Sequence, residues 1–505
     1  MIPLKQRIGI GITDSTALFR FYAYLIVAVG GLIHLYIACA NHFYFRTFAY
    51  DYGVYNFAWR DFAHLHSSSV PIYLSQHPPA FIQDHFSLTL PLLAPLYWLV
   101  QPLLGTYSLL VIQWAFIMLG AWYTLQFAEK RTHLAWLPPI VVLYSFLLLG
   151  RYTAYQNDFN IVILGASVWP IFFFGLLHEK KWLVSLSSMF ILINREDGAL
   201  GLFFIALFFY FSYPKHAFVR RYTPLLALIS IIYFTLTFLY FIPALADEHN
   251  QFSLFTFSAL GKDPFEAVTF LMHHPLTACQ LLFVNHTGHP TEDYYKSSFY
   301  LVYLLSGGWI LLTRPLLLFP LIPFLAKKMW NDDAYRWGLE GFYSVEIATL
   351  LPLLLVMAVA QWTNEIKIRW ALTLTLLLTL LTTLEHTHNR DTSKYNFANP
   401  AFQQCAVNRE KLMACLNQLP ADAAVCASGK IIPHLALRDH IYYFPRYEQA
   451  DYVLVFLEKD TYPLKHNEFA QNISDLRTSQ AWQVLYEDKQ LLLMKRKAFN
   501  GSNAP

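Results

Sequence analysis

The residues best suited to chemistry lie in a long polar loop at residues 41–103. Asp51 stands in a Tyr-Asp-Tyr-Gly run, and Asp84 and His85 follow further along the loop. A carboxylate can act as a general base on a hydroxyl group. A loop of this length in such an apolar chain is usually functional. We expect it to build an active site at a membrane surface with Asp51 as the reacting group, although Asp is also a common turn residue.

A second candidate is the charged triplet Arg195, Glu196 and Asp197, which has apolar runs on both sides and almost no loop. One charged side chain at the bilayer centre costs roughly 2.5–3.5 kcal/mol, so three facing lipid would cost about 8–10 kcal/mol. The triplet must therefore face a wet cavity, pair internally or lie at the interface. It is either a short polar turn or a cation–anion site that binds substrate outside the membrane core.

Asp158 and Arg151 stand in a third polar turn, residues 151–160. An Asp before an apolar run is a good helix N-cap, so Asp158 has a structural alternative. Three acidic positions predicted to share one face of the protein are more suggestive together than any one of them alone.

The loop histidines suit a metal site less well. His64, His66, His77 and His85 could join Asp84 around a divalent ion, but their spacing matches no known metal motif. Loop histidines that hydrogen-bond or stack on aromatic rings are the simpler interpretation. The sequence requires no cofactor, and a Mg or Mn ion is compatible with the converging carboxylates.

Composition indicates the elements that must position these residues. The chain has 505 residues, of which 56% are hydrophobic and 14% charged, far fewer charges than in a soluble domain. Recurrent apolar runs near the length of a bilayer crossing predict a polytopic α-helical membrane protein, whose first span is an uncleaved signal anchor. The eleven predicted spans are 18–40, 106–127, 134–150, 161–177, 182–197, 198–213, 224–245, 298–313, 315–330, 345–362 and 368–385.

Basic residues predict the orientation. Lys and Arg fall in alternate short loops on the side of the N-terminus, which the positive-inside rule makes cytoplasmic. An odd number of spans then puts the C-terminus outside, with the outer loops 41–103 and 246–297. Lys327 and Lys328 fall on the outer side and conflict with this assignment. The proline-broken stretch 86–101 is predicted to be a re-entrant or interfacial helix.

The composition becomes that of a soluble domain near residue 391, which predicts a transmembrane domain at 1–390 and a small extracytoplasmic α/β domain at 391–505. Asn408–Leu419 has the pattern of an amphipathic helix. Cys405, Cys415 and Cys426 allow one disulfide, and free thiols fit equally well. Short strands are predicted at Ala424–Ala427, Ile441–Phe444, Tyr452–Phe456, Gln483–Tyr486 and Leu491–Met494.

An ordered set of motifs resembles the bacterial membrane-protein family catalogued as domain of unknown function 2079, over about residues 20–496. The motifs are Tyr50-Asp51-Tyr52-Gly53, Asp84-His85-Phe86-Ser87, Leu93-Ala94-Pro95-Leu96-Tyr97, Asn157-Asp158-Phe159 and Arg195-Glu196-Asp197. Pro433-His434-Leu435, with Tyr442–Pro445 and Ala450-Asp451-Tyr452, is similar to the family's tail. The family's Lys-Glu-Asp is Arg195-Glu196-Asp197 here, and its Phe-His after Asp158 is Phe159-Asn160, so any role of that His is lost or supplied elsewhere.

That family resembles a branch of the GT-C superfamily, whose members transfer sugars from polyprenyl-phosphate donors on the outer side of the membrane. The resemblance implies an essential acid in the first outer loop, which matches Asp51, and a second acid at the next outer turn, which matches Asp158. It also implies a polyprenyl-phosphate-linked sugar donor, a glycan, lipid or protein acceptor, and a place in the inner membrane.

The predicted reaction is therefore an inverting transfer of a hexosyl or pentosyl group to an acceptor hydroxyl, with Asp51 as general base. Arg195, or Arg151 as a second candidate, would bind the leaving phosphate. Glu196 and Asp197 would orient Arg195 or bind acceptor hydroxyls, Asp158 would bind acceptor or support Asp51, and Asp84 and His85 would contact substrate. The alternatives are a transporter or flippase of a lipid-linked or amphipathic solute, and a non-enzymatic assembly protein whose outer domain binds envelope partners.

Overall fold

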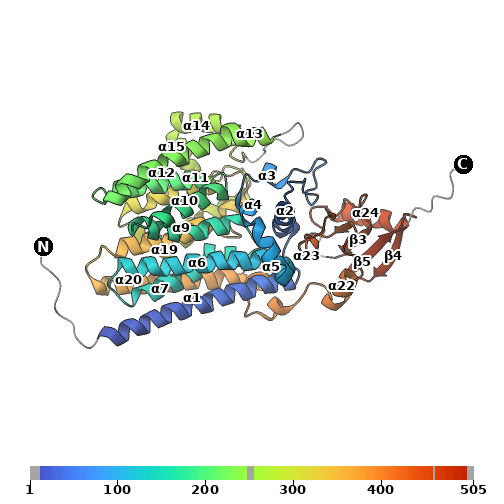
Figure 1. Ribbon diagram of the computed structural model, residues 1–505, viewed down its shortest axis with the longest axis horizontal. Helices are drawn as coiled ribbons and strands as arrows, with labels where there is room; N and C mark the ends of the chain where they lie inside the picture. The colour runs from blue at the N-terminus through green and yellow to red at the C-terminus, as the bar shows by residue number, and fades with distance from the viewer. Residues whose placement is uncertain (1–11, 247–254, 390–391, 459–460, 498–505) are drawn as a thin grey trace.

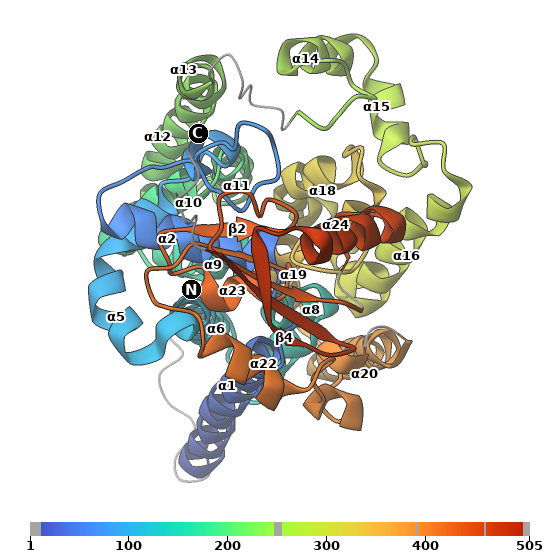
Figure 2. The same cartoon turned by 90° about the vertical axis from the view of Figure 1, so that its right-hand side faces the viewer.

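A computed structural model describes residues 12–246, 255–389, 392–458 and 461–497. The fold is a bundle of helices with a small five-stranded sheet at one end (Figure 1). The N-terminal end of α1 lies at the opposite end of the bundle from the sheet. Figure 2 looks onto the sheet and shows it over the end of the bundle, in front of α8, α9 and α19.

The helices of the bundle are long in some segments and broken in others. They are α1 (Ile12–Phe43), α6 (Ser108–Arg131), α7 (Leu137–Leu147), α8 (Leu149–Gln156), α9 (Ile161–Leu177), α10 (Lys181–Asn194), α11 (Gly198–Ser212), α12 (Ala217–Leu236), η4 (Thr237–Phe241), α13 (Ile242–Leu245), α16 (Asp293–Tyr303), η6 (Leu304–Gly308), α17 (Trp309–Leu311), η7 (Pro315–Leu321), α18 (Ile322–Met329), α19 (Val345–Val359) and α20 (Glu365–Asn389).

Short helices form the connections. They are η1 (Ala49–Gly53), α2 (Val54–Ala63), α3 (Phe81–Asp84), α4 (Thr89–Leu93), η2 (Ala94–Leu96), α5 (Tyr97–Leu104), η3 (Gly105–Tyr107), α14 (Pro264–His273), α15 (Pro275–Leu281), η5 (Pro290–Glu292), η8 (Ala334–Trp337), α21 (Thr392–Tyr395) and η9 (Pro400–Gln403). The predicted re-entrant stretch 86–101 is thus divided among α4, η2 and α5.

Four helical segments in the described part of the chain are long and apolar enough to cross a membrane, or five if α7 and α8, bent by 56°, form one span. They are Thr16–Phe43, Thr89–Arg131, Ala217–Leu245 and Glu365–Asn389. The count of eleven spans stays a prediction. At 298–330 the hydropathy pattern runs through real breaks, because Gly307 has a φ of +117° and Pro320 lies inside η7.

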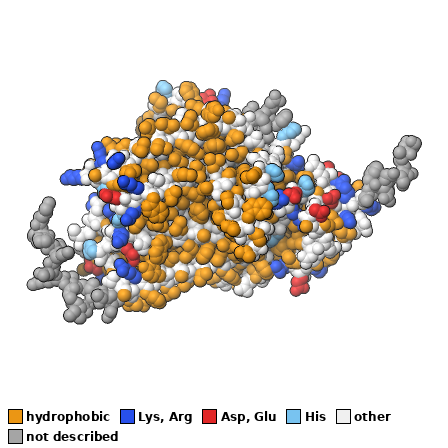
Figure 3. All heavy atoms as spheres, in the orientation of Figure 1, with side chains coloured by type: hydrophobic (Ala, Val, Ile, Leu, Met, Phe, Trp, Pro, Cys, Tyr) orange, Lys and Arg blue, Asp and Glu red, His pale blue; other side chains and the backbone are white. Residues whose placement is uncertain are grey.

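The surface of the bundle agrees with a membrane location. Figure 3 shows hydrophobic side chains covering the middle of the bundle, with charged side chains gathered toward its two ends. Lys327 and Lys328, which conflict with the predicted orientation, do not lie freely in an outer loop. The Lys327 ammonium lies 2.7 Å from Asp197 and 2.8 Å from Glu346, whereas Lys328 is 2% exposed and donates to backbone carbonyls. Lys327 is therefore a structural cation and Lys328 a buried hydrogen-bond donor, and the orientation itself stays a prediction.

The sheet contains β1 (Val425–Ala427), β2 (Ile441–Tyr443), β3 (Tyr452–Phe456), β4 (Trp482–Glu487) and β5 (Leu491–Arg496), in the order β2-β1-β3-β5-β4. β1 pairs in parallel with β2 and β3, and β5 pairs antiparallel with β3 and β4. The predicted strands are confirmed, and the predicted amphipathic helix is α22 (Arg409–Leu416). We call these strands, with α22, α23 (Ile432–Leu435) and α24 (His466–Thr478), the sheet module.

The central strands are covered on both faces. Alternate residues such as Val453 and Leu492 pack under α24, whereas Leu454 and Leu493 face the opposite way. That opposite face shares one hydrophobic core with η1 and α2 of the first loop. All five cysteines are free thiols, so the allowed disulfide does not form.

The module packs closely against the bundle at α23. A Cβ on Gly53 would lie 2.7 Å from the Ile432 side chain, so only glycine permits this approach. His434 stacks on His42 at 3.9 Å between ring centroids and on Phe45 at the same distance. Residues far apart in the chain are thereby held in direct contact.

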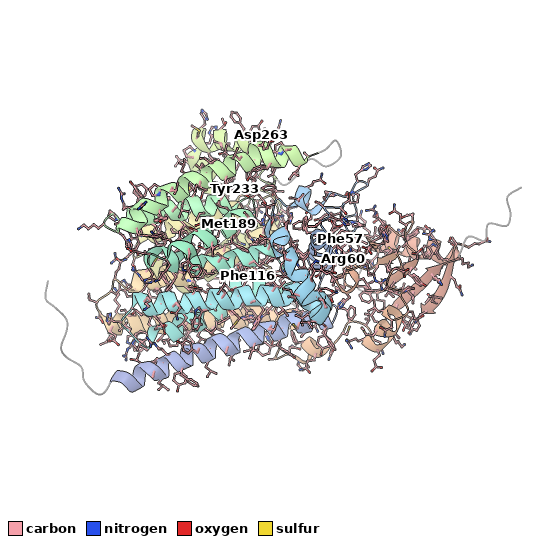
Figure 4. All side chains as sticks on the ribbon, viewed as in Figure 1. Phe57, Arg60, Phe116, Met189, Tyr233 and Asp263 are labelled. Atoms are coloured by element: carbon pink, nitrogen blue, oxygen red, sulfur yellow. The ribbon has the colours of Figure 1, made fainter. Side chains whose placement is uncertain are left out.

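Arginines add polar ties around this core. Arg46 donates to the carbonyls of Phe402 and Gln404 at 2.6 and 2.7 Å. Arg60 pairs with Asp439, and Figure 4 shows Arg60 on the part of α2 that lies toward the module. Arg446 donates a hydrogen bond of 2.9 Å to the Tyr73 carbonyl.

The variant Gly53→Ala tests this contact. The added methyl group would collide with a β-branched side chain, so we expect a loss of about 1–3 kcal/mol in the stability of the docked module. The measurement is the rate of proteolysis within the module in nanodiscs, together with the apparent unfolding midpoint. Gly338→Ala is the matched control, since its Cβ would meet nothing closer than 3.4 Å. Equal protection in the two variants would show that the close approach at Gly53 is unimportant.

Candidate active site

Asp51 is placed by a single turn of π-helix, η1, between Phe48 and α2. The backbone N–H of Phe48, the residue just before η1, donates to Asp158 Oδ2 at 2.7 Å. Asp158 is 3% exposed and lies between α8 and α9, so it ties the start of η1 to the bundle. The structure thus brings together the acids of the first and third polar segments.

Lys394 completes this cluster, and the sequence analysis missed it. Its ammonium donates to Asn157 Oδ1 at 2.8 Å and lies 3.4 Å from Asp158 Oδ1. Burial lowers the pKa of Lys394, but the carboxylates of Asp158 and Asp51 outweigh this and raise it to about 12. Lys394 is therefore a permanent cation at neutral pH. Its position at the expected start of a soluble domain carried no signal of this role.

In this cluster, the carboxyl group of Asp51 has a strongly shifted pKa. The pKa of Asp51 is raised from 3.8 to about 7, because burial and the neighbouring Asp158 carboxylate raise it more than Lys394 lowers it. One cation thus serves two neighbouring carboxylates. The incomplete compensation leaves Asp51 able to hold or release a proton near neutral pH, as a general base requires.

Asp51 also lines a groove of about 840 Å³ between the bundle and the sheet module. We call it the tyrosine groove. Its lining residues are Phe48, Tyr50, Asp51, Tyr335, Lys430, Thr461, Tyr462 and His466. The volume is within the roughly 300–1,000 Å³ typical of small-molecule sites. Apart from Asp51 and Tyr50, its lining residues were not identified from the sequence, because they come from segments separated by hundreds of positions.

The charged triplet forms a second cluster, which we call the ion network. Arg195 lies 2.8 Å from Glu196 and 3.9 Å from Asp197. Lys327 joins Asp197 to Glu346, a residue of α19. The network contains two cations and three carboxylates, so internal pairing, one of the three alternatives for the triplet, is present. Glu346 was not predicted as a site residue, although a Glu inside the apolar run of α19 is a signal that the sequence carries.

Charged groups of both clusters act on the hydroxyl group of Tyr55. Burial raises the pKa of Tyr55, Asp51 and Asp84 raise it further, and Arg195 opposes them. Asp84 itself accepts a hydrogen bond of 2.6 Å from Tyr73 and lies 3.2 Å from His85 Nδ1. Asp84 and His85 therefore lie beside the site, although neither lines the tyrosine groove.

Arg151 is not brought into this arrangement. Its side chain is completely buried, and its Nε donates to Tyr155 at 2.7 Å. It does not line the tyrosine groove. Among the described residues, no three His, Cys, Asp or Glu side chains converge in a way that could hold a metal ion, so we derive no step through a metal.

Comparison with known proteins identifies the family. Residues 41–493 match the family described as predicted membrane protein DUF2079. No curated protein matches the chain. Among solved structures it is similar to an Archaeoglobus fulgidus oligosaccharyltransferase, crystallised tethered by a disulfide to an acceptor peptide containing the NVT sequon. That similarity has a TM-score of 0.41 and 11% identity, over 87% of this chain and 69% of the other.

The raised pKa of Asp51 predicts a pH-dependent cost to stability. Because the pKa is raised from 3.8 to about 7, the folded protein retains a proton that the unfolded chain releases across that interval. Stability from this group therefore falls as the pH rises from about 4 to 7. Asp51→Asn removes the buried charge, so we expect it to stabilise the protein by about 2–4 kcal/mol at pH 8 and by little at pH 4.

The measurement is the apparent unfolding midpoint of both proteins at the two pH values. Asp422→Asn, at an exposed position, is the control and should shift neither midpoint. An equal stabilisation by Asp51→Asn at pH 4 and pH 8 would contradict a titrating carboxyl at this position.

Proposed function

The chain belongs to the DUF2079 family of predicted membrane proteins, and from that premise we propose that it is a glycosyltransferase that uses a polyprenyl-phosphate sugar donor. One observation carries the proposal. Asp51, whose pKa is raised to about 7, opens on a groove lined by tyrosines at one end of an apolar helix bundle. Such a groove offers aromatic faces and hydroxyl groups to a sugar, and it offers a base to an acceptor hydroxyl.

In the proposed reaction, Asp51 accepts the proton of the acceptor hydroxyl as that oxygen attacks the anomeric carbon of the donor sugar. The bond between that carbon and the phosphate oxygen breaks, and polyprenyl phosphate leaves with the bonding electrons. A single displacement of this kind inverts the anomeric configuration. The transferred group is a hexosyl or pentosyl unit, and the acceptor is a glycan, lipid or protein hydroxyl.

Asp158 acts on Asp51 through position and charge. Its two oxygens are occupied by the Phe48 N–H and the Lys394 ammonium, and it is nearly fully buried. This favours support of Asp51 over direct binding of the acceptor. The Asp158 carboxylate also keeps the pKa of Asp51 high, which a base working near neutral pH requires.

The leaving phosphate develops negative charge, and we assign the cations of the ion network to it. Arg195 keeps 21% of its side chain exposed, so its guanidinium can reach an incoming phosphate while Glu196 and Asp197 fix its orientation. Lys327 holds Asp197 and Glu346 and so stabilises the whole network. Arg151, which is sealed in the bundle, has no part in this proposal.

The donor tail would lie against the span formed by α12, η4 and α13. Leu225, Leu228 and Ile232 of α12 project outward and are exposed. At the other end of this span, the Leu245 carbonyl accepts from Gln83 at 2.9 Å, beside Asp84. A prenyl chain on this surface would thus have its phosphate end next to the loop that carries the site.

The test is turnover in nanodiscs with a panel of polyprenyl-phosphate sugars. Wild type should release free polyprenyl phosphate in the presence of acceptor, and Asp51→Asn should lower the rate about 10²–10⁴-fold while the donor still binds. Asp422→Asn should keep the wild-type rate. Undiminished release by Asp51→Asn would contradict its role as base. Equal movement of the lipid-linked sugar across liposomes by both proteins, without release, would favour a transporter or flippase.

A further inference from the structure

The tyrosine groove has two walls of different charge. Phe48, Tyr50, Asp51 and Tyr335 form the bundle wall. Lys430, Thr461, Tyr462 and His466 form the module wall. Asp51 therefore lies on one wall of the groove, and Lys430 and His466 lie on the other. A ligand that fills the space meets a carboxylate on one side and an ammonium and an imidazole on the other.

The position of Lys430 is fixed by close packing. A Cβ on Gly429, the preceding residue, would lie 2.6 Å from the Phe48 ring, so the turn after β1 passes directly over the residue just before η1. Lys430 then follows at the edge of the groove, three residues after the end of β1 at Ala427. The same contact thus helps to place both Lys430 and Asp51.

Tyr462 and His466 complete the module wall. The carbonyl of Tyr462 accepts a hydrogen bond of 2.6 Å from Tyr443 of β2, and its ring lies 5.7 Å from Phe48. The Tyr462 and Tyr50 rings are 6.3 Å apart at 90°. These rings form an aromatic corner that can pack against the apolar face of a sugar ring, as aromatic side chains do in ligand sites. His466 is the first residue of α24 and adds a second nitrogen donor on the same wall.

We infer that the acceptor is an anionic sugar, a hydroxylated ring that carries a phosphate or carboxylate group. This deepens the proposed function and rests on it. Lys430 and His466 bind the anionic group, the tyrosines hold the ring, and the reacting hydroxyl points to Asp51 on the opposite wall. Lys430 and His466 thus determine acceptor specificity, whereas the proton transfer belongs to Asp51.

The charges favour this orientation over its reverse. A phosphate placed against Asp51 would meet a carboxylate, and the neighbouring Asp158 would add repulsion. Lys394, the cation that those two acids share, bonds Asn157 and Asp158. An anion that enters the groove is therefore attracted to the module wall, which leaves the uncharged hydroxyl end for Asp51.

The experiment compares binding of glucose, glucose 6-phosphate and glucuronate to the full chain in neutral phosphatidylcholine nanodiscs, by calorimetry without any donor. We expect wild type to prefer both anionic sugars. Lys430→Glu should weaken their binding about tenfold or more, since a charge-assisted contact is worth roughly 1.5–3 kcal/mol, and should leave glucose unaffected. Lys430→Arg should retain the preference, and His466→Gln should weaken it partially.

Lys489→Glu is the matched control, because Lys489 is exposed in the β4–β5 turn and does not line the groove. Unfolding midpoints equal to that of wild type show that each variant is folded. Equal affinity of wild type for glucose and glucose 6-phosphate, or equal loss in Lys430→Glu and Lys489→Glu, would overturn the inference. Displacement of glucose 6-phosphate by farnesyl phosphate would also overturn it, since Lys430 would then belong to the donor side.

Two further measurements distinguish a lipid headgroup from a free sugar as the anionic ligand, and the acceptor class from the proposed mechanism. Replacing part of the phosphatidylcholine with phosphatidylinositol tests whether the anionic sugar is a lipid headgroup, in which case it competes with glucose 6-phosphate in a Lys430-dependent way. Asp51→Asn should keep the anion preference. A preference that survives while Asp51→Asn retains full transfer activity would reject the proposed mechanism and leave the acceptor class standing.

Discussion

The packing of α23 against η1 is the contact on which the rest of the site depends. A π-turn of five residues has little stability of its own, and Asp51 is in the middle of it. The bundle holds one side of this turn through the bond from Phe48 to Asp158. The module holds the other side through Ile432, which packs where Gly53 has no side chain. The proposed base is thus positioned by the bundle on one side and by the module on the other, and neither part alone would hold it.

This double support explains how a half-buried carboxylate can persist with so little compensation. Charged groups lose hydration on burial and need partners. The ion network meets that need with two cations for three carboxylates, each held by direct pairs of 2.7–2.8 Å. Asp51 instead shares Lys394 with Asp158, and because this compensation is incomplete, its pKa is raised. A loop without rigid support would relax and let water in, and the pKa would return toward its ordinary value.

The sequence predicted those features that depend on local pattern. The strands of the module are confirmed because β1, β3 and β5 are continuous apolar runs, typical of strands covered on both faces. The polar loop and Asp51 stood out because charge is rare in this chain. Lys394 and Lys430 did not, since each gains its meaning from residues hundreds of positions away. The breaks at Gly307 and in η7 were also missed, because hydropathy averages over a window and does not register single backbone breaks.

The conflict between Lys327 and the positive-inside rule also arises because the role of a residue depends on partners that are distant in the sequence. The rule concerns basic residues that remain in short, hydrated loops, where they resist translocation. Lys327 is bound by two carboxylates, and Lys328 donates to the carbonyl of Gly338 at 2.6 Å from a buried position. A lysine that is neutralised inside the fold tells little about the side of the membrane on which it lies. It tells instead where the fold needs a cation, and here that place is the network of carboxylates behind the loop that carries Asp51.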